Sequence, residues 1–191
     1  MREILKKKFK PRIRARIRRN KQIFSKNIDS FFDWIKGAEL VELKECNTEE
    51  DPVRPELDNV FRRSYGRKIF GVKYLGEIHA VMCFAYTNKI PKNVEELDKF
   101  SHDAFLQSAQ RDQNVGQIAI AYTVWSKKKG GGKLIVKEVF KKIKKSNHLD
   151  RLVTLSPLTE MATRFHKKNG AKLIQVNETT QNFEYQVEKK I

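Results

Sequence analysis

The chain has 191 residues, of which 39% are hydrophobic and 33% are charged, and its formal net charge is +17 at pH 7. This length favours a single domain that folds without disulfide or metal staples. Two isolated cysteines argue against a secreted disulfide scaffold, and no apolar run approaches the roughly 20 residues that cross a bilayer. We therefore expect a cytoplasmic, intracellular protein with reduced thiols, and the spacing of its histidines predicts no metal site.

The first 24 residues form a basic arm. Residues 1–21 hold eleven lysines and arginines against Glu3, a net of +10, which leaves +7 for the rest of the chain. Such an arm can neutralise the phosphates of a nucleic acid or another polyanion, bind an acidic membrane face, act in targeting, or simply remain solvated or pair as an edge strand. We expect residues 1–24 to be this arm and residues 25–191 to be a single domain.

Between the arm and residue 116, hydrophobic spacing and turn residues predict alternating helices and strands. The expected helices cover residues 27–36, 55–61 and 94–101, the expected strands cover 38–46, 68–75 and 77–87, and loops are expected at 47–55 and 107–116. The strand at 77–87 is almost wholly apolar, so we expect it near the centre of a sheet.

Residues 117–125 are rich in β-branched and aromatic side chains, which predicts a strand. A turn of three lysines and three glycines follows at 127–132, and from Lys133 the apolar spacing becomes helical. Because the first amides of a helix lack partners and carry partial positive charge, a phosphate or diphosphate fits there. The turn can instead be a flexible connection with a solvated lysine cluster, and its spacing matches neither a P-loop nor a Rossmann turn.

A further strand is expected at 152–156 and a helix at 159–169, and they carry Ser156 at a strand end and His166 in the helix. A hydroxyl and an imidazole can orient a carboxylate or thioester oxygen and supply a proton near neutral pH. The alternatives are structural: a serine before proline often caps a helix or makes a turn, and a histidine among lysines can lie on a helix surface.

The run Lys127-x-x-Gly130-x-Gly132 resembles the acyl-CoA cradle of the GCN5-related N-acetyltransferase fold, in which a glycine turn between a strand and a helix wraps the diphosphate of coenzyme A. The resemblance implies an α/β fold of the α+β mixed-sheet type. Its central, mostly antiparallel sheet would be flanked by helices and splayed at the acyl-CoA site. His166 occupies the place of a tyrosine that often protonates the departing thiolate in that fold.

Three motifs resemble the catalytic domain of malonyl-CoA decarboxylase, which is a branch of that fold superfamily. They are Leu155-Ser156-Pro157, the run Phe165-His166-Lys167-Lys168-Asn169-Gly170-Ala171, and Asn182-Phe183-Glu184-Tyr185. With looser likeness upstream, the resemblance covers about the last two thirds of the chain. Full-length decarboxylases carry a helical oligomerisation domain and a long insertion between the serine and histidine motifs, whereas nine residues separate Ser156 from His166 here.

The resemblance implies an acyl-CoA enzyme whose substrate is a coenzyme A thioester, malonyl-CoA or acetyl-CoA, without a metal. It implies that Ser156 positions the substrate carboxylate or the thioester oxygen and that His166 acts as the acid. The residues expected to hold coenzyme A are Tyr122, Thr123, Val124, Lys127, Lys129, Gly130, Gly131, Gly132 and Lys133.

Two other functions stay open from the sequence. An N-acyltransferase that uses acetyl-CoA on the same fold needs a base to free an amine, and the candidates are Glu77, Glu160, His79 and Tyr122. A protein that has kept the fold without catalysis could bind phosphate or nucleic acid through the arm and the basic helix at 133–145.

Overall fold

The computed structural model describes residue 30 and residues 33–111 and 116–186. The basic arm at 1–24 and half of the expected helix at 27–36 lie outside these residues, and the described residues 30 and 33–36 are helical. The chain divides into two compact units, Met1–Ala38 and Glu39–Ile191, so the expected boundary at residue 25 stays a prediction. The sheet and the candidate site belong to the second unit.

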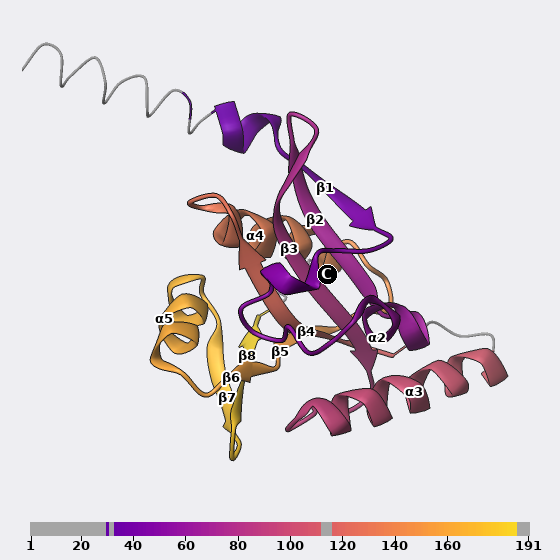
Figure 1. The fold of residues 1–191 in the computed structure, drawn as a ribbon. Coiled ribbons are helices and arrows are strands. Elements are labelled where there is room, and N and C mark those ends of the chain that lie inside the picture. The colour runs from indigo at the N-terminus through magenta and orange to yellow at the C-terminus, as the bar shows by residue number, and fades with distance from the viewer. Residues whose placement is uncertain (1–29, 31–32, 112–115, 187–191) are drawn as a thin grey trace, which may run out of the picture. The chain divides into compact units, whose positions relative to one another are not determined.

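An eight-stranded sheet forms the centre of the second unit (Figure 1). Its strands are β1 (Glu39–Leu43), β2 (Lys68–Tyr74), β3 (Glu77–Thr87), β4 (Ile118–Ser126), β5 (Arg151–Thr154), β6 (Ser156–Pro157), β7 (Lys172–Val176) and β8 (Thr180–Tyr185). The spatial order is β1-β2-β3-β4-β5-β8-β6, with β7 paired to β8. Among the described pairs only β4 and β5 run parallel, which confirms the expected mixed, mostly antiparallel sheet.

Helices pack on both faces of this sheet. They are α2 (Asn59–Arg63), α3 (Val94–Arg111), α4 (Gly131–Lys144) and α5 (Glu160–Lys168), with short 3-10 turns η1 (Thr48–Glu50) and η2 (Ser64–Gly66). Leu97 of α3 joins a core cluster with Cys83 and Ala85 of β3. On the other face Gly131 of α4 approaches Ala80, as expected because successive strand residues point to opposite faces. The strand β3 is therefore central, as its apolar sequence predicted.

Several local expectations are confirmed with small shifts. The hairpin closes at Leu75 and Gly76, which both have positive φ, 51° and 87°, as a two-residue hairpin turn requires. The helix α4 begins at Gly131, two residues before its expected start, and α5 lies between the caps Thr159 and Asn169.

Two expectations are wrong in their extent. The helix α3 runs to Arg111, so the first five residues of the loop expected at 107–116 are helical; glutamine, alanine and arginine are good helix formers, and a polar helix face needs no apolar partner. The helix expected from Pro55 begins at Asn59, because the Asp58 carboxylate caps it by accepting a hydrogen bond from the Phe61 amide at 2.7 Å.

Candidate active site

The strands β4 and β5 pair side by side and then separate. Pairing runs from Ile118 with Arg151 to Ala121 with Thr154, and the Leu155 amide donates one more hydrogen bond to the Ala121 carbonyl at 2.9 Å. Beyond this point β6 pairs with β8 and not with β4. The pairing of β3 with β4 shifts at the same level, so that Tyr122 is an extra, bulged residue. The sheet is therefore splayed here, as expected.

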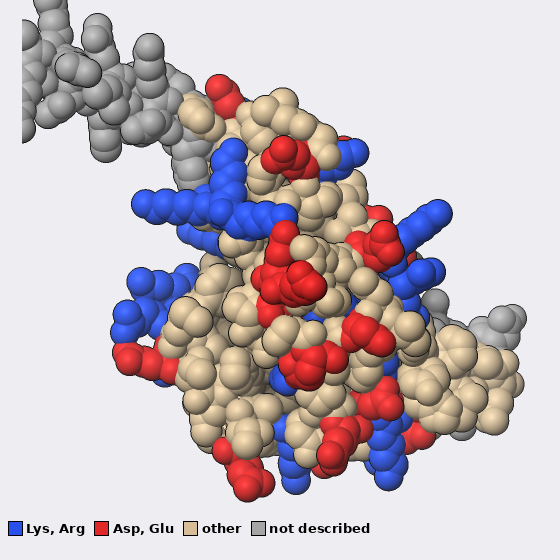
Figure 2. Space-filling view, viewed as in Figure 1, with Lys and Arg blue, Asp and Glu red and all other residues tan. Residues whose placement is uncertain are grey.

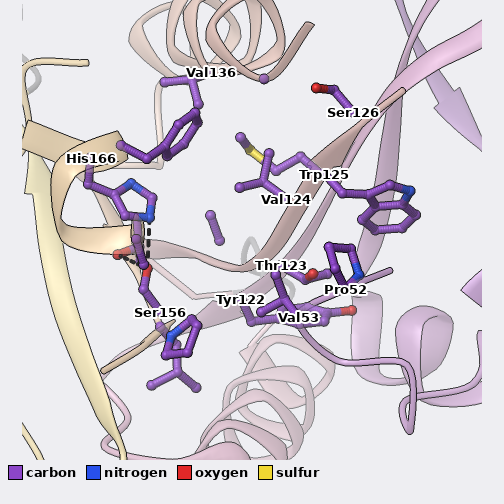
Figure 3. A pocket seen from close by; sticks show the side chains of 18 of the residues that line it. Pro52, Val53, Tyr122, Thr123, Val124, Trp125, Ser126, Val136, Ser156 and His166 are labelled. Carbon is purple, nitrogen blue, oxygen red and sulfur yellow. Dashed lines mark hydrogen bonds between the residues drawn. The ribbon is translucent and has the colours of Figure 1, made fainter. Parts of the chain in front are cut away.

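A cavity of about 350 Å³ occupies the splay (Figure 3). Ser156 and His166 form one side of it, and Pro52, Val53 and Thr123 lie across from them. Most of the other lining side chains are apolar and come from β4, α4 and α5: Ala121, Val124, Trp125, Val136, Met161, Ala162 and Phe165. An acyl chain can therefore pack against an apolar surface in this space.

Ser156 and His166 meet in this cavity. The Ser156 hydroxyl lies 2.8 Å from His166 Nε2, and both residues are buried, with 5% of each exposed. Strand β6 brings the serine to the end of the splay, and the Thr159 hydroxyl caps α5 by accepting from the Ala162 amide, which starts the helix that carries the histidine. The expectation of a surface histidine is excluded by this burial.

Burial also sets the charge of His166. Desolvation disfavours the protonated imidazole and lowers the pKa of His166 to about 4. The phenyl ring of Phe183 stacks on the imidazole, with centroids 5.0 Å apart and planes at 26°. The imidazole of the free protein is thus neutral at pH 7, so one ring nitrogen is a donor and the other is an acceptor.

A chain of hydrogen-bonding groups runs through the pair. His166 Nδ1 lies 3.0 Å from the Tyr185 hydroxyl, and the Ser156 hydroxyl donates to Thr154 Oγ1 at 3.0 Å. Burial raises the pKa of Tyr185, so this phenol keeps its proton. With Tyr185 donating to Nδ1, the proton on Nε2 points at Ser156, whose own proton goes to Thr154 Oγ1. With the order reversed, Nδ1 donates to Tyr185, and Ser156 donates to Nε2 instead of to Thr154. The imidazole can therefore either present or receive a proton at the serine.

Two residues of this hydrogen-bonded series, Thr154 and Tyr185, were not predicted from the sequence to have a role. Tyr185 ends the motif Asn182-Phe183-Glu184-Tyr185, which carries the family resemblance without indicating a role for the tyrosine. Its partner Leu152 in β5 places the phenol beside α5, and that pairing could not be read from spacing along the chain. Thr154 gave no signal because a threonine in a strand is ordinary.

Close packing explains two of the three glycines before α4. A Cβ on Gly131 would lie 3.0 Å from the Ser126 Cβ and 3.3 Å from the Ala80 Cβ, and a Cβ on Gly132 would lie 3.2 Å from the Phe165 ring. Gly130 has a φ of 86°, in the left-handed region that glycine favours. The Gly131 amide is engaged in the turn, where it donates to the Lys128 carbonyl at 2.9 Å.

The structure brings only some of the expected coenzyme A residues to the cavity. Tyr122, Thr123, Val124, Lys127 and Gly132 line it, whereas Lys129, Gly130, Gly131 and Lys133 are not part of its lining. The latter four lie in the turn and the first helical residues that continue from its edge.

Side chains at the bulge are already occupied. The Tyr122 ring is buried in the core, where it meets the edge of the Phe61 ring, and the Thr123 hydroxyl lies 2.8 Å from both carboxylate oxygens of Asp51. At these two positions a ligand can meet the backbone, while at Val124 it meets the side chain.

Charge at the cavity mouth is paired. Lys127 Nζ lies 2.7 Å from Glu50 Oε1, and both residues contribute to the lining. On the face shown in Figure 2, acidic side chains gather over η1, and basic side chains project beside them from the turn before α4. Among the described residues no group of three His, Cys, Asp or Glu side chains could hold a metal ion, and no described helix is long and apolar enough to cross a membrane.

No family model and no curated protein matches the chain. Among solved structures, a GphF GNAT-like decarboxylase in complex with isobutyryl-CoA is similar with a TM-score of 0.61 and 9% identity, over 78% of this chain and 100% of that chain. The loading GNATL domain of CurA from Lyngbya majuscula is similar with a TM-score of 0.57 and 12% identity, over 80% of this chain and 99% of that one. This chain has the GCN5-related N-acetyltransferase fold.

A malonyl-CoA decarboxylase from Cupriavidus metallidurans is also similar, with a TM-score of 0.46 and 19% identity, over 73% of this chain and 36% of that chain. Identities this low concern the fold of the GCN5-related N-acetyltransferases and not the chemistry. The chemistry depends on the side chains that this chain places in the splay.

Proposed function

We propose that this protein is an acyl-CoA enzyme of the malonyl-CoA decarboxylase type, which releases CO2 from a malonyl thioester. The observation that carries the proposal is the hydrogen-bonded pair of Ser156 and His166, both buried at the side of a largely apolar cavity on this fold. A protein of similar fold, described as a GNAT-like decarboxylase in complex with isobutyryl-CoA, supports a coenzyme A thioester as the substrate.

The turn before α4 is the proposed site of the coenzyme A diphosphate. The amides of Gly132 and Lys133 belong to the first turn of a 14-residue helix and have no partners within it. Lys127, Lys129 and Lys133 supply positive charge, and the diphosphate would replace Glu50 as the partner of Lys127. The pantetheine arm would then follow the backbone of 122–124 to the serine.

Decarboxylation breaks the bond between the carboxylate carbon and the α carbon, and the electron pair moves to the thioester oxygen as an enolate. Ser156 would hold the carboxylate or the thioester oxygen by hydrogen bonding. The added negative charge of the substrate raises the pKa of the neutral imidazole, so His166 can take a proton from solvent and deliver it to the α carbon. The balanced products are acetyl-CoA and CO2, with one proton consumed.

The test is release of CO2 or bicarbonate from malonyl-CoA without an amine acceptor. We expect turnover by the wild type and losses of about a hundredfold or more in kcat for His166→Asn and for Ser156→Ala, as is typical when a positioned proton donor or its partner is removed. Thr163→Ala, on the same helix as His166 but outside the cavity lining, is the control and should retain activity. Full turnover by His166→Asn would refute the assignment.

The N-acyltransferase alternative has less support from the geometry. Glu77, Glu160 and His79 do not line the cavity that holds Ser156 and His166. Tyr122 does line it, but burial raises the pKa of its phenol well above the usual value, which makes it a poor base at neutral pH. Free coenzyme A that forms from acetyl-CoA only when an amine is added would favour this alternative.

A further inference from the structure

A short segment, residues 51–54, crosses the cavity opposite the serine, and its two ends, Asp51 and Arg54, are buried. Asp51 begins it and is fixed to β4 through Thr123, while its carboxylate also accepts from the Val53 amide at 2.9 Å. Pro52 and Val53 face the cavity (Figure 3). Arg54 ends the segment, and its side chain turns back toward the point where the strands separate.

Arg54 bridges the two edges of the splay. Its Nε donates to the Tyr122 carbonyl at 3.0 Å and its Nη2 donates to the Leu155 carbonyl at 3.2 Å. The bulge explains why these carbonyls need a partner: the carbonyls of Ala121 and Tyr122 both point toward the gap, and only the first meets a strand amide, that of Leu155. The guanidinium therefore replaces hydrogen bonds that the separated strands cannot make.

Among the described residues no carboxylate contacts the Arg54 guanidinium directly. Asp51 is ion-paired with Arg62 at 2.8 Å, and both of those side chains are fully buried. Arg54 itself donates its side-chain hydrogen bonds to neutral carbonyls, and the nearby Glu56 is exposed to solvent. Two buried arginines thus share one buried aspartate, and desolvation lowers the pKa of Arg54, as expected for a cation with too little compensation.

This positive charge lies immediately behind the reaction centre. The Leu155 carbonyl that Arg54 holds belongs to the peptide that precedes Ser156. The charged residues of the cavity lining, Glu50 and Lys127, lie at its mouth and are paired with each other. In a cavity of low polarity an unpaired charge acts over several ångströms, so Arg54 is placed to favour a negative charge beside Ser156.

We propose that Arg54 is the positioning and specificity-determining residue of this site: it fixes the peptide before Ser156, and its charge selects acyl groups that carry a carboxylate over neutral ones. The inference rests on the proposed function and names its substrate class, the thioesters of malonate-type half acids. If Arg54 acted only through its hydrogen bonds to the two carbonyls, removing its charge would not change the preference for a carboxylate-bearing acyl group.

Two variants separate charge from hydrogen bonding. Arg54→Lys keeps the charge and loses the two-pronged geometry, whereas Arg54→Gln keeps a donor and loses the charge. Arg63→Gln is the matched control, because Arg63 is an exposed arginine on the neighbouring helix α2. For each, the melting temperature and the kcat and KM for malonyl-CoA are measured. Dissociation constants for malonyl-CoA and acetyl-CoA are measured by calorimetry in a common His166→Asn background, which prevents turnover.

We expect Arg54→Gln to lose about tenfold of the preference for malonyl-CoA over acetyl-CoA, and Arg54→Lys to keep the preference within about threefold, since the charge is the discriminating element. Both should lower kcat, and Arg63→Gln should change neither quantity. An unchanged preference in folded Arg54→Gln, equal losses in the two variants, or failure of both to fold would each overturn the inference. If the wild type releases no CO2 while the binding preference still follows the charge, the proposed function fails and the selectivity stands.

Discussion

The environment of His166 keeps its imidazole neutral while both ring nitrogens keep hydrogen-bond partners. Both ring nitrogens have oxygen partners, Ser156 and Tyr185, and neither partner is ionised. A surface histidine would be partly protonated at neutral pH, and a histidine beside a carboxylate would be mostly protonated. A neutral imidazole beside a serine can become protonated when a negatively charged substrate binds, because no carboxylate of the described residues holds a proton on it in the free state.

The same environment predicts a pH-dependent stability. The pKa of His166 is about 4 in the folded state and near 6.5 when unfolded, so between these values the unfolded chain binds a proton that the folded chain does not. Stability from this residue is therefore complete above pH 6.5 and declines as the pH falls toward 4. The free energy of unfolding of the wild type relative to His166→Asn should decrease by about 2 to 3 kcal/mol between pH 7 and 4.5.

Urea unfolding of both proteins at several pH values measures this difference. Because His166→Asn retains every other titrating group, the general acid destabilisation of the chain cancels in the comparison. A difference that stays constant over this range would mean that His166 is not desolvated as the structure has it.

The glycines at the start of α4 meet two requirements, an open turn for a phosphate and close packing of the helix on the sheet. The sequence predicts an open phosphate-binding turn at these glycines, and the structure adds that α4 lies this close to β3 and β4 because Gly131 lacks a side chain. The two nearest atoms that an added Cβ would meet are the Cβ atoms of Ser126 and Ala80, and the third is the backbone oxygen of His79 at 3.4 Å, so all three are fixed to strand backbone. A change of side-chain rotamer can therefore not relieve these contacts, and the helix would have to move.

Gly131→Ala is therefore expected to destabilise the protein by about 1 to 3 kcal/mol, the usual cost of overpacking, and to weaken coenzyme A binding as α4 shifts from the cavity. Thermal unfolding and calorimetric titration with coenzyme A measure the two effects. Lys137→Ala, at an exposed position of the same helix, should change stability by no more than about 0.5 kcal/mol. Wild-type stability in Gly131→Ala would show that the helix does not lie this close to the sheet.

At the scale of the whole molecule, much of the fold could be predicted because it follows local rules. Strand periodicity, the hairpin at 75–76 and the strand, glycine turn and helix at 117–144 are each written within a short stretch of sequence. The sequence places Ser156 at a strand end and His166 in the helix that follows, but only the structure brings the two side chains together.

The rest of the site depends on contacts that no local pattern records. Arg54 lies 68 residues from Tyr122 and 101 residues from Leu155 along the chain, in a segment that the sequence presents as an acidic loop with prolines. Its partners are backbone carbonyls, which are the same for every residue type. Only the splay of the sheet makes them available, so the role of Arg54 is a property of the assembled fold.

The basic arm at residues 1–24 lies outside the described residues, and its role stays a prediction that belongs to the whole chain. Eleven of the 40 lysines and arginines lie in its first 21 residues, so removing 1–24 lowers the net charge from +17 to +7. If the arm binds a polyanion, the full chain should bind short duplex DNA more tightly than residues 25–191. For about six neutralised phosphates its affinity should fall about a thousandfold between roughly 50 and 200 mM salt.

Fluorescence anisotropy at several salt concentrations measures this affinity, and the rate with malonyl-CoA serves as the internal control because Ser156 and His166 both lie in the second unit. Equal DNA affinities for the full chain and for residues 25–191 would show that the arm does not bind DNA. A loss of turnover on truncation would show that catalysis requires the arm. The two readouts separate the roles because counterion release depends on salt with a slope set by the number of phosphates contacted, while proton transfer inside a buried cavity does not.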